Sequence, residues 1–237
     1  MTVSQNTLKL AVVSAGLSVP SSTRLLADRL TQEVRRQLER TGREVEVTVV
    51  ELRDVAVDLA HNLVTGFPPP RLKDAITAVT GADGLIAVTP VFSASYSGLF
   101  KSFFDVLDDD ALTGLPVLAA ATGGTARHSL VLEHAMRPLF AYLRAIVVPT
   151  SVYASSEDWG GSGDKLTAAL PARIARAGGE LAELMRHLPG KTGSSTDGND
   201  RALISDAGYA DSVVPFTEQL AALGLDNVAH AKRQNTA

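Results

Sequence analysis

Three short loops in this 237-residue chain combine hydroxyl side chains with glycine or proline, and each follows an apolar run. The first, "SAGLSVPSSTR" (14–24), holds five hydroxyl residues and leads into a predicted helix. The second is "TPVFSASYSG" (89–98) and the third is "ATGGTARHSL" (121–130). Hydroxyls and the free N–H groups of a helix N-terminus bind phosphate, whereas glycine and small side chains admit a flat ligand. The loops therefore predict a site for a phosphorylated planar molecule.

The first loop is predicted to bind the phosphate. An ordinary helix cap is the simpler alternative, but a cap uses one hydroxyl and this loop has five. The loop matches neither G-x-G-x-x-G nor the G-K-[ST] of a P-loop, so a monophosphate fits better than a dinucleotide or a nucleoside triphosphate. The predicted phosphate ligands are Ser14, Ser21, Ser22, Thr23 and Arg24.

The other two loops are predicted to hold a planar ring. Pro90 is expected to end sheet pairing and to leave the backbone after it available to the ring's polar edge. The glycine pair of the third loop lets a backbone pass close to a flat surface, although a plain tight turn would use the same residues. The predicted ring contacts are Pro90, Val91, Phe92, Ser93, Thr122, Gly123 and Gly124. Arg127 and His128 come next and indicate an anionic group nearby. A ring with one phosphate indicates FMN.

Alternating strands and helices would position these loops. Five continuous apolar runs are typical of buried parallel strands, at 8–13, 44–50, 83–90, 115–124 and 145–154. Predicted helices carry Leu26, Leu30, Val34 and Leu38, or span 72–80, 126–144 and 165–187, and "HNLVTGFPPP" (61–70) is predicted to be a loop. The pattern predicts an α/β fold, a flavodoxin-like doubly wound parallel sheet of order 2-1-3-4-5 with helices on both faces. Ligands bind such a sheet at the carboxyl ends of its strands, where the three loops lie.

Composition limits the remaining possibilities. The net charge of -4 argues against a nucleic acid or an anionic membrane as the main partner. The absence of cysteine excludes thiolate chemistry, disulfides and cysteine-ligated metals. No apolar run reaches the roughly 18 residues needed to span a bilayer, and the N-terminal sequence has no convincing export signal, so a cytoplasmic protein is expected. We expect a domain at 1–188, a flexible linker at 189–203, and a C-terminal extension with one short helix at 204–237.

Other catalytic patterns compete weakly with a flavin site. His128 and His134 are six residues apart, which does not suit a helical metal pair, and "DVLDDD" (105–110) is typical of a solvated helix end. No G-x-S-x-G elbow is present. Neither a metal nor a catalytic acid, base or nucleophile is predicted, which agrees with direct hydride transfer between cofactors.

Two segments resemble a known family. "TPVFSASYSGLFKSFFDVLD" (89–108) is similar to the T-P-x-[YF]-x-x-S-x-x-G-x-x-K segment of NAD(P)H-dependent FMN reductases. "ATGGTARHSLVLEHAMRPLFAYLRA" (121–145) resembles the alkanesulfonate and methanesulfonate subgroup, which feeds reduced flavin to a luciferase-like monooxygenase. The resemblance implies a homodimer or homotetramer, FMN reduction by NADPH or NADH, and a cytoplasmic two-component system. In the mechanism that we expect, Arg127 and His128 contact the phosphates of the nicotinamide dinucleotide.

This chain departs from the family pattern at two points. Many relatives carry an arginine shortly after the first strand, where this chain has Leu17, so Arg24 is expected to take over part of the phosphate contact. In the alkanesulfonate reductases a tyrosine lies in a helix bulge at the subunit interface, and His134 occupies the matching position here. Pro138, four residues on, lacks a backbone N–H, so we predict a wide helical turn around His134.

Three alternatives remain open besides a reductase that releases reduced FMN. One is an FMN-retaining reductase of quinones, azo dyes or metal oxyanions. Another is a flavodoxin-type electron carrier, although the T-x-T-G-x-T phosphate loop of flavodoxins is missing here. The third is a non-enzymatic flavin sensor.

Overall fold

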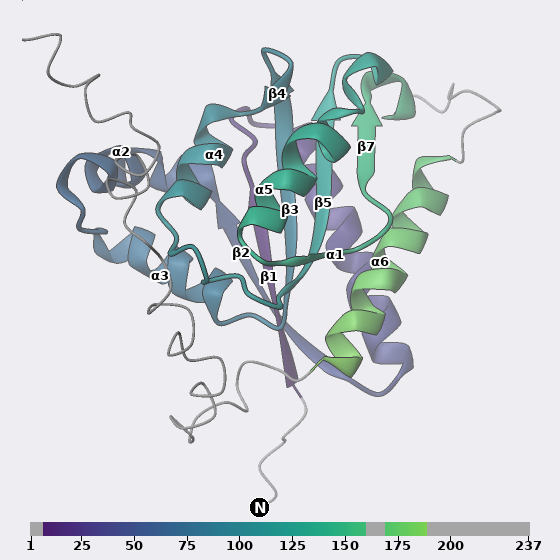
Figure 1. Cartoon of the computed structure of the whole chain (residues 1–237). Coiled ribbons are helices and arrows are strands. Elements are labelled where there is room, and N and C mark those ends of the chain that lie inside the picture. The colour runs from purple at the N-terminus through teal and green to yellow at the C-terminus, as the bar shows by residue number, and fades with distance from the viewer. Residues whose placement is uncertain (1–6, 160–168, 189–237) are drawn as a thin grey trace, which may run out of the picture. The chain divides into compact units, whose positions relative to one another are not determined.

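A parallel β-sheet runs through the part of the chain that this computed structural model describes, residues 7–159 and 169–188 (Figure 1). Its parallel strands are β1 (Thr7–Ser14), β2 (Glu44–Glu51), β3 (Gly84–Phe92), β5 (Pro116–Gly123), β6 (Ile146–Val147) and β7 (Val152–Ser155). A two-residue strand, β4 (Ser95–Tyr96), pairs antiparallel with the end of β3. The order is β2-β1-β3-β5, and both β6 and β7 pair with β5 in parallel. The predicted order 2-1-3-4-5 is confirmed, with the fifth position shared by two short strands. The predicted linker and C-terminal extension lie outside the described residues.

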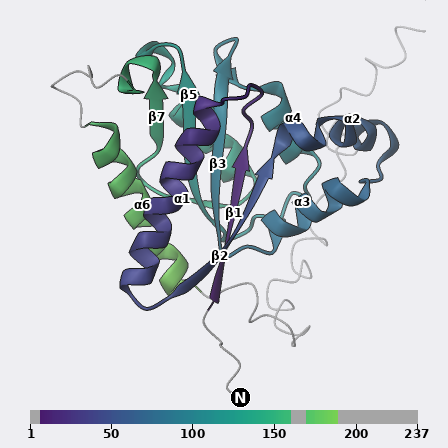
Figure 2. The ribbon, with the colours of Figure 1, turned by 180° about the vertical axis from the view of Figure 1, so that it is seen from behind.

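Helices cover both faces of the sheet (Figures 1 and 2). The helices are α1 (Ser22–Arg40), α2 (Ala56–Thr65), α3 (Pro70–Thr80), α4 (Gly98–Asp105), α5 (Arg137–Tyr142) and α6 (Leu170–His187). Shorter turns are η1 (Leu52–Val55), η2 (Ala126–His128), η3 (Leu132–Met136) and η4 (Ser156–Trp159). The side chains of α1 and α6 pack in one hydrophobic cluster, and those of α2, α3, α4 and α5 pack in the other.

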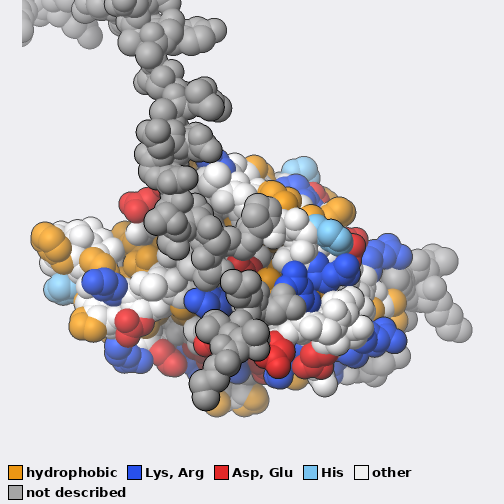
Figure 3. Space-filling model, turned by 90° about the horizontal axis from the view of Figure 1, so that it is seen from below, with side chains coloured by type: hydrophobic (Ala, Val, Ile, Leu, Met, Phe, Trp, Pro, Cys, Tyr) orange, Lys and Arg blue, Asp and Glu red, His pale blue; other side chains and the backbone are white. Residues whose placement is uncertain are grey.

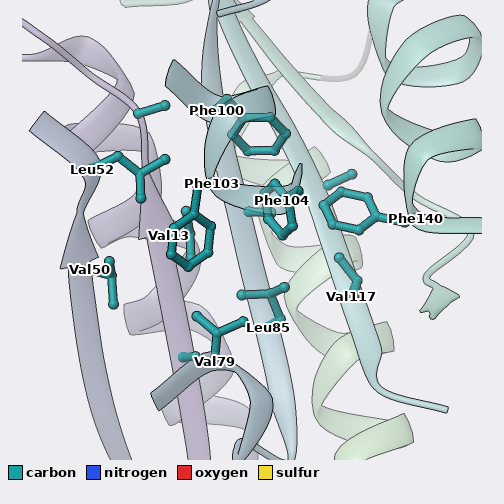
Figure 4. Packing of buried hydrophobic residues seen from close by; sticks show 14 of the residues in the cluster. Val13, Val50, Leu52, Val79, Leu85, Phe100, Phe103, Phe104, Val117 and Phe140 are labelled. Atoms are coloured by element: carbon teal, nitrogen blue, oxygen red, sulfur yellow. The ribbon is translucent and has the colours of Figure 1, made fainter. Parts of the chain in front are cut away.

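The central strands are buried on both sides, which explains their continuous apolar sequence. In β1, Ala11 and Val13 join the cluster under α3 and α4, while Leu10 and Val12 join the cluster under α1 and α6. Successive side chains of a strand point to opposite faces, so both sets must be apolar when helices cover both faces. Figure 4 shows Phe100, Phe104 and Phe140 together on the α4 side, with ring centroids 4.8 and 5.1 Å apart in successive pairs.

Helix α1 confirms the pattern read from its sequence. Leu26, Leu30, Val34 and Leu38 are all fully buried, as their spacing of four predicts. Ser21 caps the helix, because its hydroxyl accepts a hydrogen bond from the backbone N–H of Arg24 at 3.2 Å. The helix N-terminus is thereby fixed at the end of the first loop.

The expectation that Pro90 ends sheet pairing was wrong. Pro90 pairs in register with Thr122 of β5, and β3 continues to Phe92 before turning back into β4. The β1–β3 ladder stops at Val88, so at Pro90 the strand has a sheet neighbour on one side only and its missing N–H is tolerated. Ser93 and Ala94 form the two-residue turn, with φ angles of 31° and 68° that side-chain-bearing residues rarely adopt.

Several predicted boundaries also shift. The segment "HNLVTGFPPP" is not all loop, because residues 61–65 finish α2 and only residues 66–69 connect it to α3. Gly66 ends α2 with a φ of 76°, a left-handed conformation that glycine adopts without strain. The predicted strand 145–154 is interrupted around Pro149, and α6 begins at Leu170. The predicted helix 126–144 is divided into η2, η3 and α5.

The surface of the described part carries charges of both signs. Figure 3 views the edge at which the parallel strands begin, where basic and acidic side chains are interspersed on the visible part of the face. Across residues 7–159 and 169–188, no helix has the length and apolar character that crossing a bilayer requires.

Candidate functional site

The carboxyl ends of β1, β3 and β5 bring the three predicted loops to one rim of the sheet. Ser14 pairs with Val88, and Pro90 pairs with Thr122, so the loops begin at neighbouring positions. The first and third loops are in direct contact, because the buried hydroxyls of Thr23 and Thr122 are 2.8 Å apart. The structure thus gathers the residues that the sequence singled out as ligands of one molecule.

Ser14 stands out in the first loop because its hydroxyl is buried without a hydrogen-bond partner among the described residues. Leaving a buried hydroxyl unsatisfied costs about 1–3 kcal/mol, so such a group indicates a missing ligand or water. It lies at the end of β1, from which the chain runs to the N-terminus of the 19-residue helix α1. An oxygen-rich anion fits this arrangement, because hydroxyl and backbone N–H donors meet there.

Gly16 keeps the first loop close to the helix cap. A Cβ at Gly16 would lie 2.1 Å from the Ser21 hydroxyl, so only glycine fits there. Ser22 is exposed, and Thr23 is buried against the third loop. The four predicted hydroxyl ligands therefore differ: Ser14 has no partner in the described structure, Ser21 caps α1, Thr23 meets Thr122, and Ser22 faces solvent.

Arg24 is engaged by two carboxylates. Its Nε lies 2.7 Å from Asp28, and its Nη1 forms a close ion pair with Glu51. The hydrogen bond to Asp28, together with the charges of Asp28 and Glu51, raises the pKa of Arg24, so it stays charged. These partners offset much of its charge, and they limit what Arg24 alone can contribute to phosphate binding.

Arg53 and Glu51 belong to this site, and the sequence reasoning missed them. Arg53 Nη2 lies 2.8 Å from the second oxygen of Glu51, and Arg53 Nη1 donates a hydrogen bond to the Ser18 carbonyl at 3.2 Å. Glu51 thus links an arginine of α1 to an arginine that holds the first loop. The available signal was the stretch "ELRD" directly after the second strand, because that strand neighbours the first.

The second loop is a short hairpin that rises from the rim (Figure 1). Thr89 is fully buried at its base, where its hydroxyl accepts from the Ser97 N–H and donates to the Pro90 carbonyl, both at 3.0 Å. Phe92 at its tip is 47% exposed. The base of the loop is held rigidly while an aromatic side chain stays available for a ligand or a second chain.

The two glycines of the third loop have different surroundings. A Cβ at Gly123 would lie 2.0 Å from the Tyr153 hydroxyl, whereas a Cβ at Gly124 would have no neighbour within 4 Å. Tyr153 donates a hydrogen bond to the Thr125 carbonyl at 2.7 Å. Gly123 is therefore required by a buried side chain of the protein, and only Gly124 leaves open space for a ligand. Sequence reasoning did not anticipate Tyr153.

Arg127 and His128 follow in η2, where both are exposed. The wide turn predicted around His134 is confirmed. Residues Leu132–Met136 form a π-helix, and the N–H of Arg137 bonds to the carbonyl of Leu132, five residues earlier. Glu133 and Arg137 pair across this turn at 2.7 Å, and that bond lowers the pKa of Glu133.

Chemically, the rim offers hydrogen-bond donors and a small open surface rather than an acid–base pair. Burial, with a further contribution from the charge of Asp158, raises the pKa of Tyr153, so its hydroxyl remains a neutral donor. Such a rim can bind and orient two cofactors for direct hydride transfer. FMN fits the residues present, because Ser14 supplies an unused donor and Gly124 supplies space.

Comparison with known proteins identifies the family. The family model for NADPH-dependent FMN reductase matches residues 8–160. An FMN reductase (NADPH) of Pseudomonas aeruginosa is 41% identical over 151 residues, which are 64% of this chain and 78% of the relative. The NADH-dependent FMN reductase SfnE of Pseudomonas putida is 37% identical over 170 residues, or 72% and 88% of the two chains.

A solved structure supports the same assignment. An oxidoreductase from Corynebacterium diphtheriae superposes with a TM-score of 0.74 and 48% sequence identity, over 78% of this chain and 100% of that one. The protein is thus an oxidoreductase whose cofactors are FMN and NADPH or NADH. This chain belongs to the NADPH-dependent FMN reductase family.

Proposed function

We propose that this protein reduces FMN with NADPH or NADH and releases the reduced flavin to a separate luciferase-like monooxygenase. Family membership supports the reductase activity. The likeness of residues 121–145 to the alkanesulfonate and methanesulfonate reductases supports the partner. The observation that carries the flavin site is the buried hydroxyl of Ser14, which has no hydrogen-bond partner among the described residues and lies at the end of β1, in the loop that leads into α1.

Each rim loop has its own role in this proposal. Ser14, Ser21, Ser22 and Thr23, with the N-terminus of α1, hold the FMN phosphate, and Arg24 adds charge from its pair with Glu51. The ring is held by Pro90, Val91, Phe92, Ser93, Thr122, Gly123 and Gly124. Arg127 and His128 bind the phosphates of the nicotinamide dinucleotide.

The protein acts by placement. FMN, when bound, accepts a hydride from the nicotinamide, and this transfer needs no side chain as acid or base. Gly124 leaves the room that a second flat ring needs, and the hydrogen bond from Ser97 to Thr89 holds the base of the second loop in place. No residue is therefore assigned a catalytic role.

Steady-state oxidation of each nicotinamide, followed near 340 nm with FMN, FAD or riboflavin as acceptor, tests the proposal. We expect FMN to have a lower KM than riboflavin, because only FMN carries the phosphate that the first loop binds. Equal KM values for the two would contradict a phosphate site. Absence of oxidation with every acceptor would leave a flavin sensor or an electron carrier as the better reading.

Gel filtration after turnover tests release of the flavin. We expect FMN to separate from the protein and a sequential kinetic pattern. Ping-pong kinetics with retained flavin would instead indicate a reductase of quinones, azo dyes or metal oxyanions. If reduced FMN is released as proposed, addition of a luciferase-like monooxygenase should couple nicotinamide oxidation to product formation.

We also propose a homodimer or homotetramer. Leu130 and Tyr142, which flank the π-helix in sequence, are 61% and 67% exposed, and Phe92 is exposed on the rim. We propose that these exposed apolar side chains contribute to the interface between subunits. Light scattering on the full chain checks the assembly, and a monomer at micromolar concentration would contradict it.

A further inference from the structure

We propose that Tyr153 is a positioning residue of the flavin site: its hydroxyl holds the third loop so that Gly124 faces the ring and Arg127 faces the nicotinamide dinucleotide. This inference rests on the proposed function and adds a residue to it. Tyr153 lies on β7, outside the three loops, and its register partner in β5 is Ala121, the first residue of the third loop.

The contact between Tyr153 and the loop is close and specific. The phenol is 5% exposed, and its Oη donates to the Thr125 carbonyl at 2.7 Å. The same hydroxyl occupies the space in which a Gly123 side chain would lie. One hydroxyl thus excludes side chains at Gly123 and ties down the carbonyl two residues later.

Tyr153 is itself anchored from the other side. Arg173 of α6 donates to the Tyr153 carbonyl and forms a close ion pair with Asp158. Asp158 also accepts hydrogen bonds from the Ser155 N–H at 2.7 Å and the Ser155 hydroxyl at 2.8 Å. The carboxyl end of β7 therefore has little freedom to move, so the phenol can act as a fixed support.

The residue that Tyr153 holds connects both proposed ligand contacts. Thr125 lies between Gly124, which has no neighbours on its open side, and η2, which carries Arg127. Without the hydrogen bond, the backbone at Gly124 would sample more conformations, and ligand binding would then have to restrict them. The hydroxyl pre-organises the loop before either cofactor arrives.

Tyr153→Phe tests this role, because it keeps the ring and removes only the hydroxyl. We expect the Kd for FMN, measured by flavin fluorescence, to rise about threefold to tenfold, in line with the loss of one neutral hydrogen bond. The KM for the nicotinamide should rise as well, while the Tm stays within about 2 °C. The matched control is Thr41→Val, which removes a hydroxyl-to-carbonyl bond of 2.8 Å to Leu38 at the far end of α1. It should leave the Kd unchanged.

The outcomes separate this inference from the proposed function. Failure of the wild-type protein to bind FMN would remove the function itself. Binding by the wild type with an unchanged Kd in Tyr153→Phe, with or without a lower Tm, would overturn the positioning role alone. If that variant does not fold, Ser155→Ala replaces it, because it loosens the anchor and leaves the ring in place. We then expect about a twofold rise in Kd, and an unchanged Kd again overturns the role.

Discussion

The first and third loops of the rim follow β1 and β5, the two strands that flank β3, yet the two loops are held in different ways. The first is tied at Ser18 by Arg53, which shares Glu51 with Arg24 in a half-exposed ionic network. The third is tied by a buried phenol that leaves no room beside Gly123. Partly exposed ion pairs are weak and sensitive to salt, whereas a close-packed buried contact tolerates little change. The first loop should therefore adapt to substitution, and the third should not.

The largest effect is expected at Gly123. Gly123→Ala would place a methyl group 2.0 Å from the Tyr153 hydroxyl, so the strand ends must separate. Overpacking of this kind costs about 2 kcal/mol, which corresponds to a fall in Tm of roughly 4–8 °C for a domain of this size. Thermal unfolding, followed by circular dichroism, measures this fall in Tm.

Gly124→Ala is the matched control, because nothing lies within 4 Å of the added atom. It should leave the Tm nearly unchanged and weaken FMN binding instead. The fall in Tm caused by Gly123→Ala should be smaller in a protein that also carries Tyr153→Phe, because that substitution removes the clashing oxygen. Strictly additive Tm changes for Gly123→Ala and Tyr153→Phe would contradict a contact between the two positions.

From the sequence, the sheet and the loops at its rim could be predicted, but the side-chain contacts that hold those loops in place could not. Continuous apolar runs and the spacing of Leu26, Leu30, Val34 and Leu38 identified the sheet and α1, because burial on two faces or one stripe has a local signature. Tyr153 and Arg53 have no such signature. Each acts on a loop about 30 residues away in sequence, Tyr153 at Thr125 and Arg53 at Ser18, so only the folded register brings it into place.

Local rules also failed where tertiary context overrides them. Pro90 remains in a strand because its ladder with β1 has already ended. The helical periodicity of residues 126–144 is real, but the π-helix divides the segment in the region where Pro138 removes an N–H. Composition predicts both glycines of the pair as flavin contacts, and only the neighbouring phenol distinguishes Gly123 from Gly124.

The next effect in size concerns Ser14. Ser14→Ala removes a buried hydroxyl without a partner in the described structure, so the flavin-free protein should be unchanged or slightly more stable. The same substitution removes a donor to a charged phosphate, so the Kd for FMN should rise about tenfold. Calorimetry of the variant without and with FMN checks the expected stability and the expected rise in Kd. Riboflavin, which has no phosphate, should bind the variant and the wild type alike.

A smaller effect is expected from the ionic network of the first loop. Arg53→Met keeps the length of the side chain but removes the bonds to Ser18 and Glu51, so the KM for FMN should rise about threefold. Added salt should reduce the difference in KM between Arg53→Met and the wild type, because salt screens the same charges in the wild type. Arg35→Met removes only an exposed pair with Glu39 at 3.8 Å on α1 and serves as the control. An equal change in the KM for FMN in Arg53→Met and Arg35→Met would exclude a role of Arg53 in positioning the first loop.

The smallest effect is the pH dependence that Tyr153 contributes through its contact with the third loop. Burial raises the pKa of Tyr153 in the folded state above its unfolded value near 10. Its contribution to stability is therefore complete below about pH 10 and is lost as the pH rises through the folded pKa. Between pH 9 and 11, the Tm of the wild type should fall about 1 °C further than that of Tyr153→Phe. The two proteins differ only in this hydroxyl, so the difference between the two curves isolates it. Parallel curves would mean that Tyr153 does not titrate as a buried group.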